Sequence, residues 1–179
     1  AMIVSGVIGA GFMVATLGAG FPLGLTMIAA TVAAVLFVSI SILGPVSGAH
    51  FNPAVTIAFL LRKAISSAAA AGYIASQVVG AIFGAVVANL MFEVPWLEIS
   101  ATGRFSAGTF LGEVVATFGL VLLILLLVKF EKSHLIPASV AAWIFAGHIF
   151  TSSTSFANPA VTIGRIFSDS AASISPDSA

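Results

Sequence analysis

The chain has 179 residues, of which 60% are hydrophobic and only 7% are charged, and its mean hydropathy is +1.20. A soluble domain carries roughly 25% charged residues, so this inventory cannot supply a water-facing surface. The formal net charge of zero leaves no basic field for nucleic acid, and the absence of cysteine excludes disulfides, thiolate metal sites and cysteine nucleophiles. The composition predicts a multi-pass protein of the cell (plasma or inner) membrane with the lipid bilayer as partner, no nucleic acid and no cofactor or metal.

The apolar segments predict several membrane-spanning helices. A span needs about 20 apolar residues, and no segment resembles a cleavable signal because apolar runs recur along the whole chain. Residues 1–17 carry no charge and no helix-start signal, which indicates part of a first span. Polar or helix-breaking stretches at 44–48 and 151–155 are expected to lie outside helices. The further predicted spans are residues 21–43, 68–92, 109–130 and the shorter 136–150.

The hexapeptide Asn-Pro-Ala-Val-Thr-Ile occurs twice, at residues 52–57 and 158–163. Each copy follows a predicted span and opens an apolar segment too short to cross a membrane, at 53–61 and 159–167. Such paired, interrupted segments are typical of midplane sites in inverted-repeat membrane proteins. Three predicted spans separate the copies, so they enter from opposite faces. The bias of Lys and Arg places the first entry on the cytoplasmic side, through Arg62, Lys63, Lys129 and Lys132.

The Asn-Pro-Ala sequence suits the start of a pore-lining helix. Asparagine is a strong N-cap whose NH2 group is then left free, and proline is favoured at the first helical position. Each helix N-terminus carries about half a positive charge, so two that meet at the midplane disfavour cations and protons. The amides of Asn52 and Asn158 are expected to donate hydrogen bonds to small uncharged solutes that permeate passively. The predicted pore motifs are Asn52, Pro53, Ala54, Asn158, Pro159 and Ala160.

The peptides before the two motifs are further candidates for the pore wall. Irregular backbone at membrane depth must be buried in protein or line a wet cavity. The predicted backbone lining is Gly48, Ala49, His50, Phe156 and Ala157.

Residues 47–56 match the pattern Ser-Gly-Ala-His-x-Asn-Pro-Ala-Val-Thr, and in these residues the chain resembles the aquaporin (major intrinsic protein) family. The resemblance implies an all-α membrane bundle with inverted repeats, two pore-lining half-helices, one pore per subunit and a homotetramer. It implies one channel domain over residues 1–179, with 1–92 as the first repeat and 109–179 as an incomplete second repeat. Glu113 matches the family's buried glutamate of the fourth span, and Thr117 and Gln77 are implied to share its supporting role.

The sequence differs from the family pattern at the selectivity filter. The family places arginine directly after the second motif, where this chain has Val161, and Arg165 one turn further is not expected to take that role. Positions carried over from the family predict an uncharged filter of small side chains: Val32, Ala146 or Gly147, Ser155 and Val161. This pattern resembles the bacterial glyceroporin-like branch that lacks the filter arginine. It implies permeation of water, glycerol-like polyols and uncharged arsenite.

The two ends also differ from the family pattern. No glutamate-bearing turn precedes Ala1, and the polar segment 168–179 stands where a sixth span is expected. Small residues at Gly72, Ser76, Gly80, Gly84 and Ala88 predict close helix contact along the third span. We therefore expect this chain to be a fragment of a longer protein.

Four ionisable residues near the predicted spans need an interpretation. Glu113 is expected to accept hydrogen bonds from the irregular backbone before a half-helix rather than to move ions. The ring of His50 is expected to be a packed or hydrogen-bonded group rather than a pH gate. His148, within the fifth span, either lines the pore or bonds a neighbouring helix. His134 is expected in a solvated turn.

Two other function classes remain open from the sequence, and one is disfavoured. No nucleophile with its base and no metal-spaced histidine pair lies in the spans, so we do not expect an enzyme. A secondary transporter with broken helices would share the inverted repeat, although its coupling usually needs titratable or ion-coordinating groups at the midplane. A non-conducting structural membrane protein could have the same composition.

Overall fold

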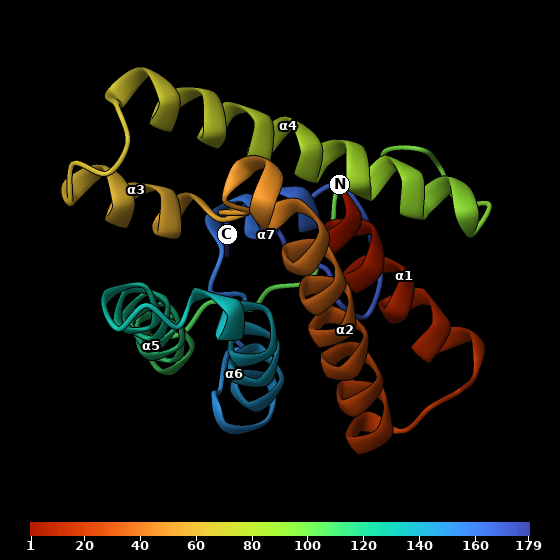
Figure 1. The fold of residues 1–179 in the computed structure, drawn as a ribbon. Helices are drawn as coiled ribbons and strands as arrows, with labels where there is room; N and C mark the ends of the chain where they lie inside the picture. Colours follow the sequence, from red (N-terminus) through yellow and green to blue (C-terminus); the bar gives the residue numbers. More distant parts are fainter.

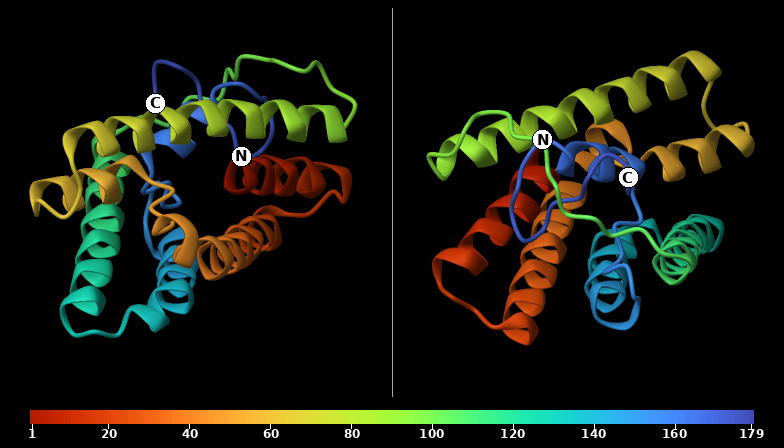
Figure 2. Two further views of the ribbon diagram at one scale, coloured as in Figure 1. Left: turned by 45° about the horizontal axis from the view of Figure 1, so that its top comes forward. Right: turned by 180° about the vertical axis from the view of Figure 1, so that it is seen from behind.

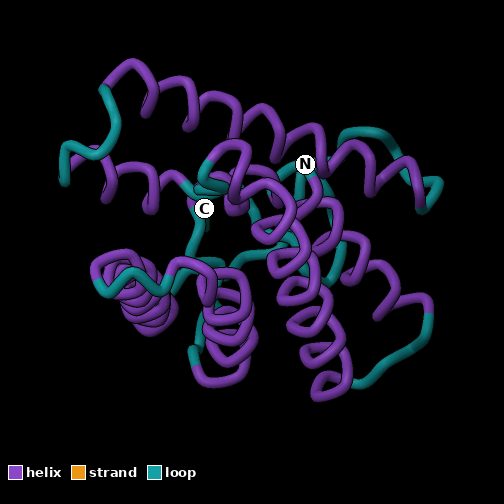
Figure 3. Tube along the Cα trace, viewed as in Figure 1, coloured by secondary structure: helices purple, strands orange, loops and turns teal.

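Seven α-helices, one 3-10 turn and their connecting loops make up the computed structural model, which describes all 179 residues (Figures 1 and 3). Four helical segments are long and apolar enough to cross a membrane: α2, α4, α5 and the continuous pair η1–α6. The predicted all-α class and the predicted spans are therefore confirmed. The elements are α1 (Met2–Thr16), α2 (Phe21–Ser47), α3 (Pro53–Leu61), α4 (Ser67–Met91), α5 (Ala107–Lys129), η1 (Ser133–Leu135), α6 (Ile136–Phe150) and α7 (Pro159–Arg165).

The end of α2 differs from the prediction. The stretch 44–48 was expected outside a helix, but α2 continues through Pro45 to Ser47. Proline removes one N–H from the ladder, and membrane helices tolerate this because neighbouring groups compensate for the lost bond. The helix stops at Gly48, which adopts φ +70° and donates its N–H to the carbonyl of Gly44 over 2.8 Å. The corresponding stretch 151–155 lies outside helices, as predicted.

Two layers of helices meet around the short helices α3 and α7. Helix α2 packs between α1 and α6, and α5 packs on the other side of α6. Helix α4 lies across the bundle and contacts α1, α3 and α7 (Figures 1 and 2). The N-termini of α3 and α7 meet below α4 in the view of Figure 1, where α3 also contacts α5.

Large apolar side chains cover much of the outer surface. Phe21, Leu61 and Phe118 are 80%, 78% and 68% exposed, a pattern that places them toward lipid rather than water. The buried core holds smaller aliphatic residues, among them Val4, Ile8 and Ala85. The helices are thus apolar both toward the core and on the outer surface, as expected of a bundle that lies in a bilayer.

The predicted small-residue stripe on α4 makes contacts over only part of its length. Gly80 and Gly84 lie against the start of α1, at Ala1, whereas Gly72 and Ser76 are exposed. A second small-residue contact, which the sequence analysis did not identify, joins α4 to α7. A Cβ atom on Gly164 would lie 2.9 Å from both the Cβ atom and the carbonyl oxygen of Ala81.

Replacing Gly164 with valine should destabilise the fold, because backbone atoms of α4 leave no room for a side chain. Overpacking of this kind typically costs about 1–3 kcal/mol. Thermal unfolding of the purified protein in detergent would measure the change. The matched control is Gly72→Val, since a Cβ atom at Gly72 meets nothing within 4 Å. Equal unfolding midpoints for the two variants would contradict the close contact of α4 with α7.

Residues 166–179 fold back on the loop between α4 and α5. Ser100 donates its N–H to the carbonyl of Ile166 over 2.9 Å, and Ser175 donates to the carbonyl of Thr102 over 2.8 Å. Ser168 and Ser173 are fully buried. This serine-rich segment follows α7 in the chain, where a sixth span was expected, and packs against the loop between α4 and α5.

Candidate functional site

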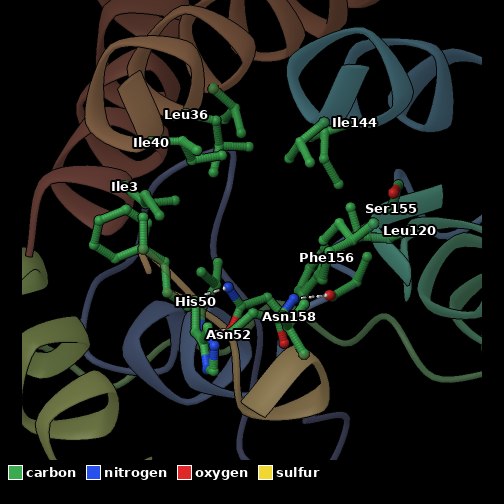
Figure 4. A pocket seen from close by; sticks show the side chains of 18 of the residues that line it. Ile3, Leu36, Ile40, His50, Asn52, Leu120, Ile144, Ser155, Phe156 and Asn158 are labelled. Carbon is green, nitrogen blue, oxygen red and sulfur yellow. Dashed lines mark hydrogen bonds between the residues drawn. The ribbon is translucent and has the colours of Figure 1, made fainter. Parts of the chain in front are cut away.

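The candidate site is a cavity between the long helices and the meeting tips of α3 and α7, which we call the central cavity (Figure 4). One wall is apolar and comes from α1, α2, α5 and α6. The facing wall is polar and comes from the two peptides that precede α3 and α7. The apolar wall includes Val7, Val32, Leu36, Ile40, Leu120, Ile124, Val140 and Ile144.

Asn52 and Asn158 cap their helices as the repeated motif predicts. The Oδ1 atom of Asn52 accepts the N–H of Ala54 over 2.9 Å. The Oδ1 atom of Asn158 accepts the N–H groups of Ala160 and Val161 over 3.1 and 3.3 Å. Pro53 and Pro159, with the alanines that follow them, form the first turns and do not line the central cavity. Both asparagines do line it.

The amide NH2 groups are not wholly free, in contrast to the expectation from the sequence. Asn52 donates from Nδ2 to the carbonyl of Ala157 over 2.6 Å, and Asn158 donates from Nδ2 to the carbonyl of Phe51 over 2.9 Å. Each asparagine thus binds the residue immediately before the other. An amide nitrogen carries two hydrogens, so one donor remains on each asparagine. The bonds fix both side chains against the cavity wall.

The lining from the two halves corresponds position by position. Ala49 and Phe51 adopt φ of +46° and +49°, and the equivalent Ser155 and Ala157 adopt +48° and +46°. Left-handed φ is uncommon for residues other than glycine, and its repetition shows that both peptides turn in the same way. At the offset of 106 residues between the motifs, the lining pairs are Ala49 and Ser155, His50 and Phe156, Phe51 and Ala157, Asn52 and Asn158, Val55 and Val161, and Phe59 and Arg165.

The carboxylate of Glu113 holds the second peptide in place. Its Oε1 atom accepts the N–H of Phe156 over 2.8 Å, and its Oε2 atom accepts the N–H of Ala157 over 2.7 Å. These are contacts of the kind that the sequence analysis expected, with the backbone before a half-helix. Thr117 lies beside Glu113 in a groove between α5 and α7, outside the central cavity.

Gln77 supports the first half in a different way. It donates from Nε2 to Oγ1 of Thr56 over 3.0 Å, and that hydroxyl in turn donates to the carbonyl of Asn52 over 3.0 Å. The chain of bonds ties α3 to α4. His50 completes this region, because its ring lies 4.7 Å from the rings of both Phe59 and Tyr73 and its Nδ1 lies 3.2 Å from Oγ1 of Thr56. The ring of His50 is therefore packed and hydrogen bonded.

The predicted filter residues are only partly brought together. Val32, Ser155 and Val161 line the central cavity, together with Gly48 of the predicted backbone lining. Ala146 is exposed on the far side of α6, and Gly147 packs against the side chain of Ser155. Neither residue lines the central cavity, because successive helical residues are rotated by about 100° and the cavity-facing position is the next one.

His148 occupies that position on α6. It is 4% exposed, lines the central cavity and bonds through Nδ1 to the carbonyl of Ile144 over 2.8 Å. Of the two alternatives left by the sequence, the structure favours the lining position, and the hydrogen bond is to its own helix. Arg165, which was not expected at the filter, lines the same cavity beside the predicted Val32, Ser155 and Val161.

Arg165 and Arg104 donate hydrogen bonds to the backbone carbonyl groups of residues 171–173. Arg165 donates from Nε to Ala172. Arg104 donates from Nε to Ser173 and from Nη2 to Ala171, both over 2.7 Å. Burial lowers the pKa of Arg104 from its usual value, although arginine remains protonated in proteins. The segment 171–173 is thereby held over the second turn of α7.

Comparison with known proteins agrees with this geometry. The family model described as "Major intrinsic protein" matches residues 1–173. The chain is similar to the aquaglyceroporin AqpS of Rhizobium meliloti (strain 1021), with 42% identity over 175 residues, 98% of this chain and 75% of that protein.

More distant relatives match shorter parts. Aquaporin NIP3-1 of Arabidopsis thaliana is 39% identical over 59% of this chain and 35% of its own length. Aquaporin-4 of Bos taurus is 34% identical over 68% of this chain and 41% of its own length. The chain thus covers less than half of these two relatives. With the family model matched over nearly every residue, the chain belongs to the major intrinsic protein family.

Proposed function

We propose that this protein is a passive transmembrane channel for small uncharged solutes, with the central cavity as part of its pore. The observation that carries the proposal is the pair of asparagine amides at the meeting N-termini of α3 and α7. Each keeps one N–H hydrogen beyond its bond to the other half, in a cavity that is otherwise mostly apolar. A solute that accepts hydrogen bonds can replace part of its hydration there, and the positive ends of two helices disfavour cations.

The solute range we propose includes water and glycerol-sized polyols, with arsenite as a further uncharged candidate. Val161 leaves the position after the second motif without a long side chain, and Ser155 and Val32 are small residues on the same cavity. The printed name of one relative, an aquaglyceroporin, agrees with this range. We propose that the protein acts as a multi-pass homotetramer of the cell membrane, with Glu113 and Gln77 as supports of the pore wall.

A swelling assay in liposomes tests this proposal. Stopped-flow light scattering with water, glycerol, urea and arsenite should show linear, non-saturating flux of water and at least one larger solute. Val161→Arg should reduce glycerol flux by about tenfold or more and water flux less, because the long side chain narrows the cavity and glycerol is the larger solute. Val161→Leu is the matched control for added volume without added charge.

Three outcomes of the assay would contradict parts of the proposal. Water flux without glycerol or arsenite flux would reject the wider pore. Saturable uptake driven by an ion gradient would favour a secondary transporter with broken helices. No flux of any solute by the reconstituted protein would favour a structural membrane protein.

A further inference from the structure

The connection between α4 and α5 begins with a group of exposed apolar side chains at residues 95–99. Trp96 and Ile99 are 63% and 52% exposed, and Leu97 between them is exposed as well. A single exposed apolar side chain is ordinary, but a contiguous group marks a contact with a membrane or with another protein. The function proposed above gives this segment no role.

The backbone of the segment is held in place at both of its ends. Buried Asn89 of α4 donates from Nδ2 to the carbonyl of Trp96 over 3.3 Å and accepts the N–H of Val94 at its own carbonyl over 3.1 Å. Beyond the segment, Ser100 is buried and donates from Oγ to the carboxylate of Asp169 over 3.0 Å. The chain turns back sharply at the end of α4 (Figure 2). The exposed side chains therefore project from a fixed backbone.

The bond from Asn89 also sets the depth of Trp96 relative to a membrane. Helix α4 has 25 residues, which at about 1.5 Å per residue gives a length of about 37 Å. The hydrocarbon core of a bilayer is about 30 Å thick, so a helix of this length that is centred in the membrane ends among the headgroups. Asn89 lies about 3 Å along the axis before the last residue of α4, Met91. The backbone of Trp96 is thus held near the boundary between hydrocarbon and headgroups.

The apolar outer face of α4 reaches the same level. Val79, Phe83 and Leu90 are all exposed. They are four and seven residues apart, so they share one helical face, which we place toward lipid like the rest of the apolar outer surface. This face extends to the last turn of α4, where Asn89 holds the backbone of Trp96. The lipid-facing surface and the segment 95–99 therefore lie at the same end of α4.

The side chains of the segment suit the interfacial layer of a bilayer. Tryptophan is enriched at the level of the headgroups, where its ring contacts apolar groups and its N–H finds an acceptor. Glu93 and Glu98, both exposed, flank Trp96 in the sequence. A carboxylate is costly in hydrocarbon, so these two residues prevent the segment from entering the core of the membrane.

We propose that residues 95–99 form an interfacial membrane anchor, in which Trp96, Leu97 and Ile99 insert into the headgroup layer of the leaflet at the C-terminal end of α4. The anchor does not depend on the proposed channel function. Its backbone is joined to the second half of the molecule, because Asn89 donates its other amide hydrogen to the carbonyl of Phe167 over 3.0 Å.

Depth-dependent fluorescence quenching tests this assignment. The chain has two tryptophans, so Trp143→Phe leaves Trp96 as the only one and Trp96→Phe leaves Trp143. Each full-length variant would be reconstituted in phosphatidylcholine that is brominated either near the headgroup or near the end of the acyl chain. Shallow bromines should quench Trp96 at least about twofold more than deep ones, because tryptophan at an interface lies at headgroup level.

Trp143 is the internal control for depth. It is partly buried in the middle of α6, so deep bromines should quench it at least as strongly as shallow ones. If Trp143→Phe does not fold, the difference between the wild-type signal and that of Trp96→Phe gives the quenching of Trp96.

Three results would overturn the proposal. Quenching of Trp96 by aqueous acrylamide but by neither lipid would place the segment in water. Protection of Trp96 from all three quenchers would mean that another protein or a second copy of this chain covers it. Stronger quenching by deep than by shallow bromines would place the ring inside the hydrocarbon and not in the headgroup layer.

Discussion

Replacing Glu113 with glutamine should strongly lower both the stability of the protein and its solute flux. Glutamine keeps one acceptor oxygen, but its NH2 group would face an N–H that now bonds to the carboxylate of Glu113. A hydrogen bond to a charged group contributes about 1.5–3 kcal/mol, and an unsatisfied buried donor adds to the loss. We expect a destabilisation of about 3 kcal/mol and a fall in water flux of about tenfold or more, because the carbonyl of Ala157 would no longer be held toward Asn52.

The unfolding midpoint in detergent and stopped-flow water flux in liposomes would measure the two effects separately. Glu98→Gln is the matched control, since Glu98 is exposed in the loop between α4 and α5. If Glu113→Gln unfolded and conducted as the control does, then the carboxylate would not be what holds the second peptide. A variant that is destabilised but conducts normally would limit Glu113 to a role in folding.

Replacing Asn158 with alanine has the second largest expected effect. The change removes the cap of α7 and leaves the carbonyl of Phe51 without its donor. A lost cap costs about 0.5–2 kcal/mol and a buried unpaired carbonyl about 1–3 kcal/mol, so we expect a loss near 3 kcal/mol and a large fall in water flux. Asn52→Ala is the matched variant in the other half, with the same two contacts at α3.

Because the two asparagines bind across the same contact, their effects should not add. A double-mutant cycle of Asn52→Ala and Asn158→Ala, measured by unfolding in detergent, should give a coupling of about 0.5–3 kcal/mol. Simple additivity would mean that the two cross-bonds act independently. Unchanged permeability of Asn158→Ala would count against the proposed channel and in favour of a structural membrane protein.

The helices could be predicted from the sequence because hydropathy and capping residues agree. Residues 136–150 were predicted as a span, and α6 has those bounds. The two half-helices begin at the prolines of the repeated motif, where Asn caps the first turn. The end of α2 is the exception. Proline usually indicates that a helix ends, but a helix in a membrane can continue past it, as α2 does at Pro45.

The filter could be predicted only in part, because spacing fixes distance along a helix but not its rotation. Ala146, Gly147 and His148 lie within 3 Å of rise along α6, at about 1.5 Å per residue, but they face three different directions. Only packing against Ser155 and the apolar wall decides which one faces the cavity. The resemblance indicated this part of α6 and could not select the residue that faces the central cavity.

The position of Arg165 on the cavity wall could have been predicted from its place on the helix, which the spacing from the motif alone does not consider. Val161 and Arg165 are four residues apart on a helix, so their side chains lie on the same face. The family pattern tied the arginine to one position, and its absence there suggested an uncharged filter. A helical-face argument applied to α7 would have placed Arg165 over Val161, although the contact with Ala172 depends on the fold of the last residues.

The mutual bonds between the two asparagines and the opposite peptides have a consequence for biosynthesis. Asn52 bonds to a residue 105 positions later in the chain, and Phe51 receives its bond from a residue 107 positions later. At roughly 5–20 residues per second, a ribosome needs about 5 to 20 s to make that stretch. Until the second motif has been made, the amide of Asn52 and the carbonyl of Phe51 lack these partners. The contact at the centre of the molecule can therefore form only after the second half-helix has been synthesised.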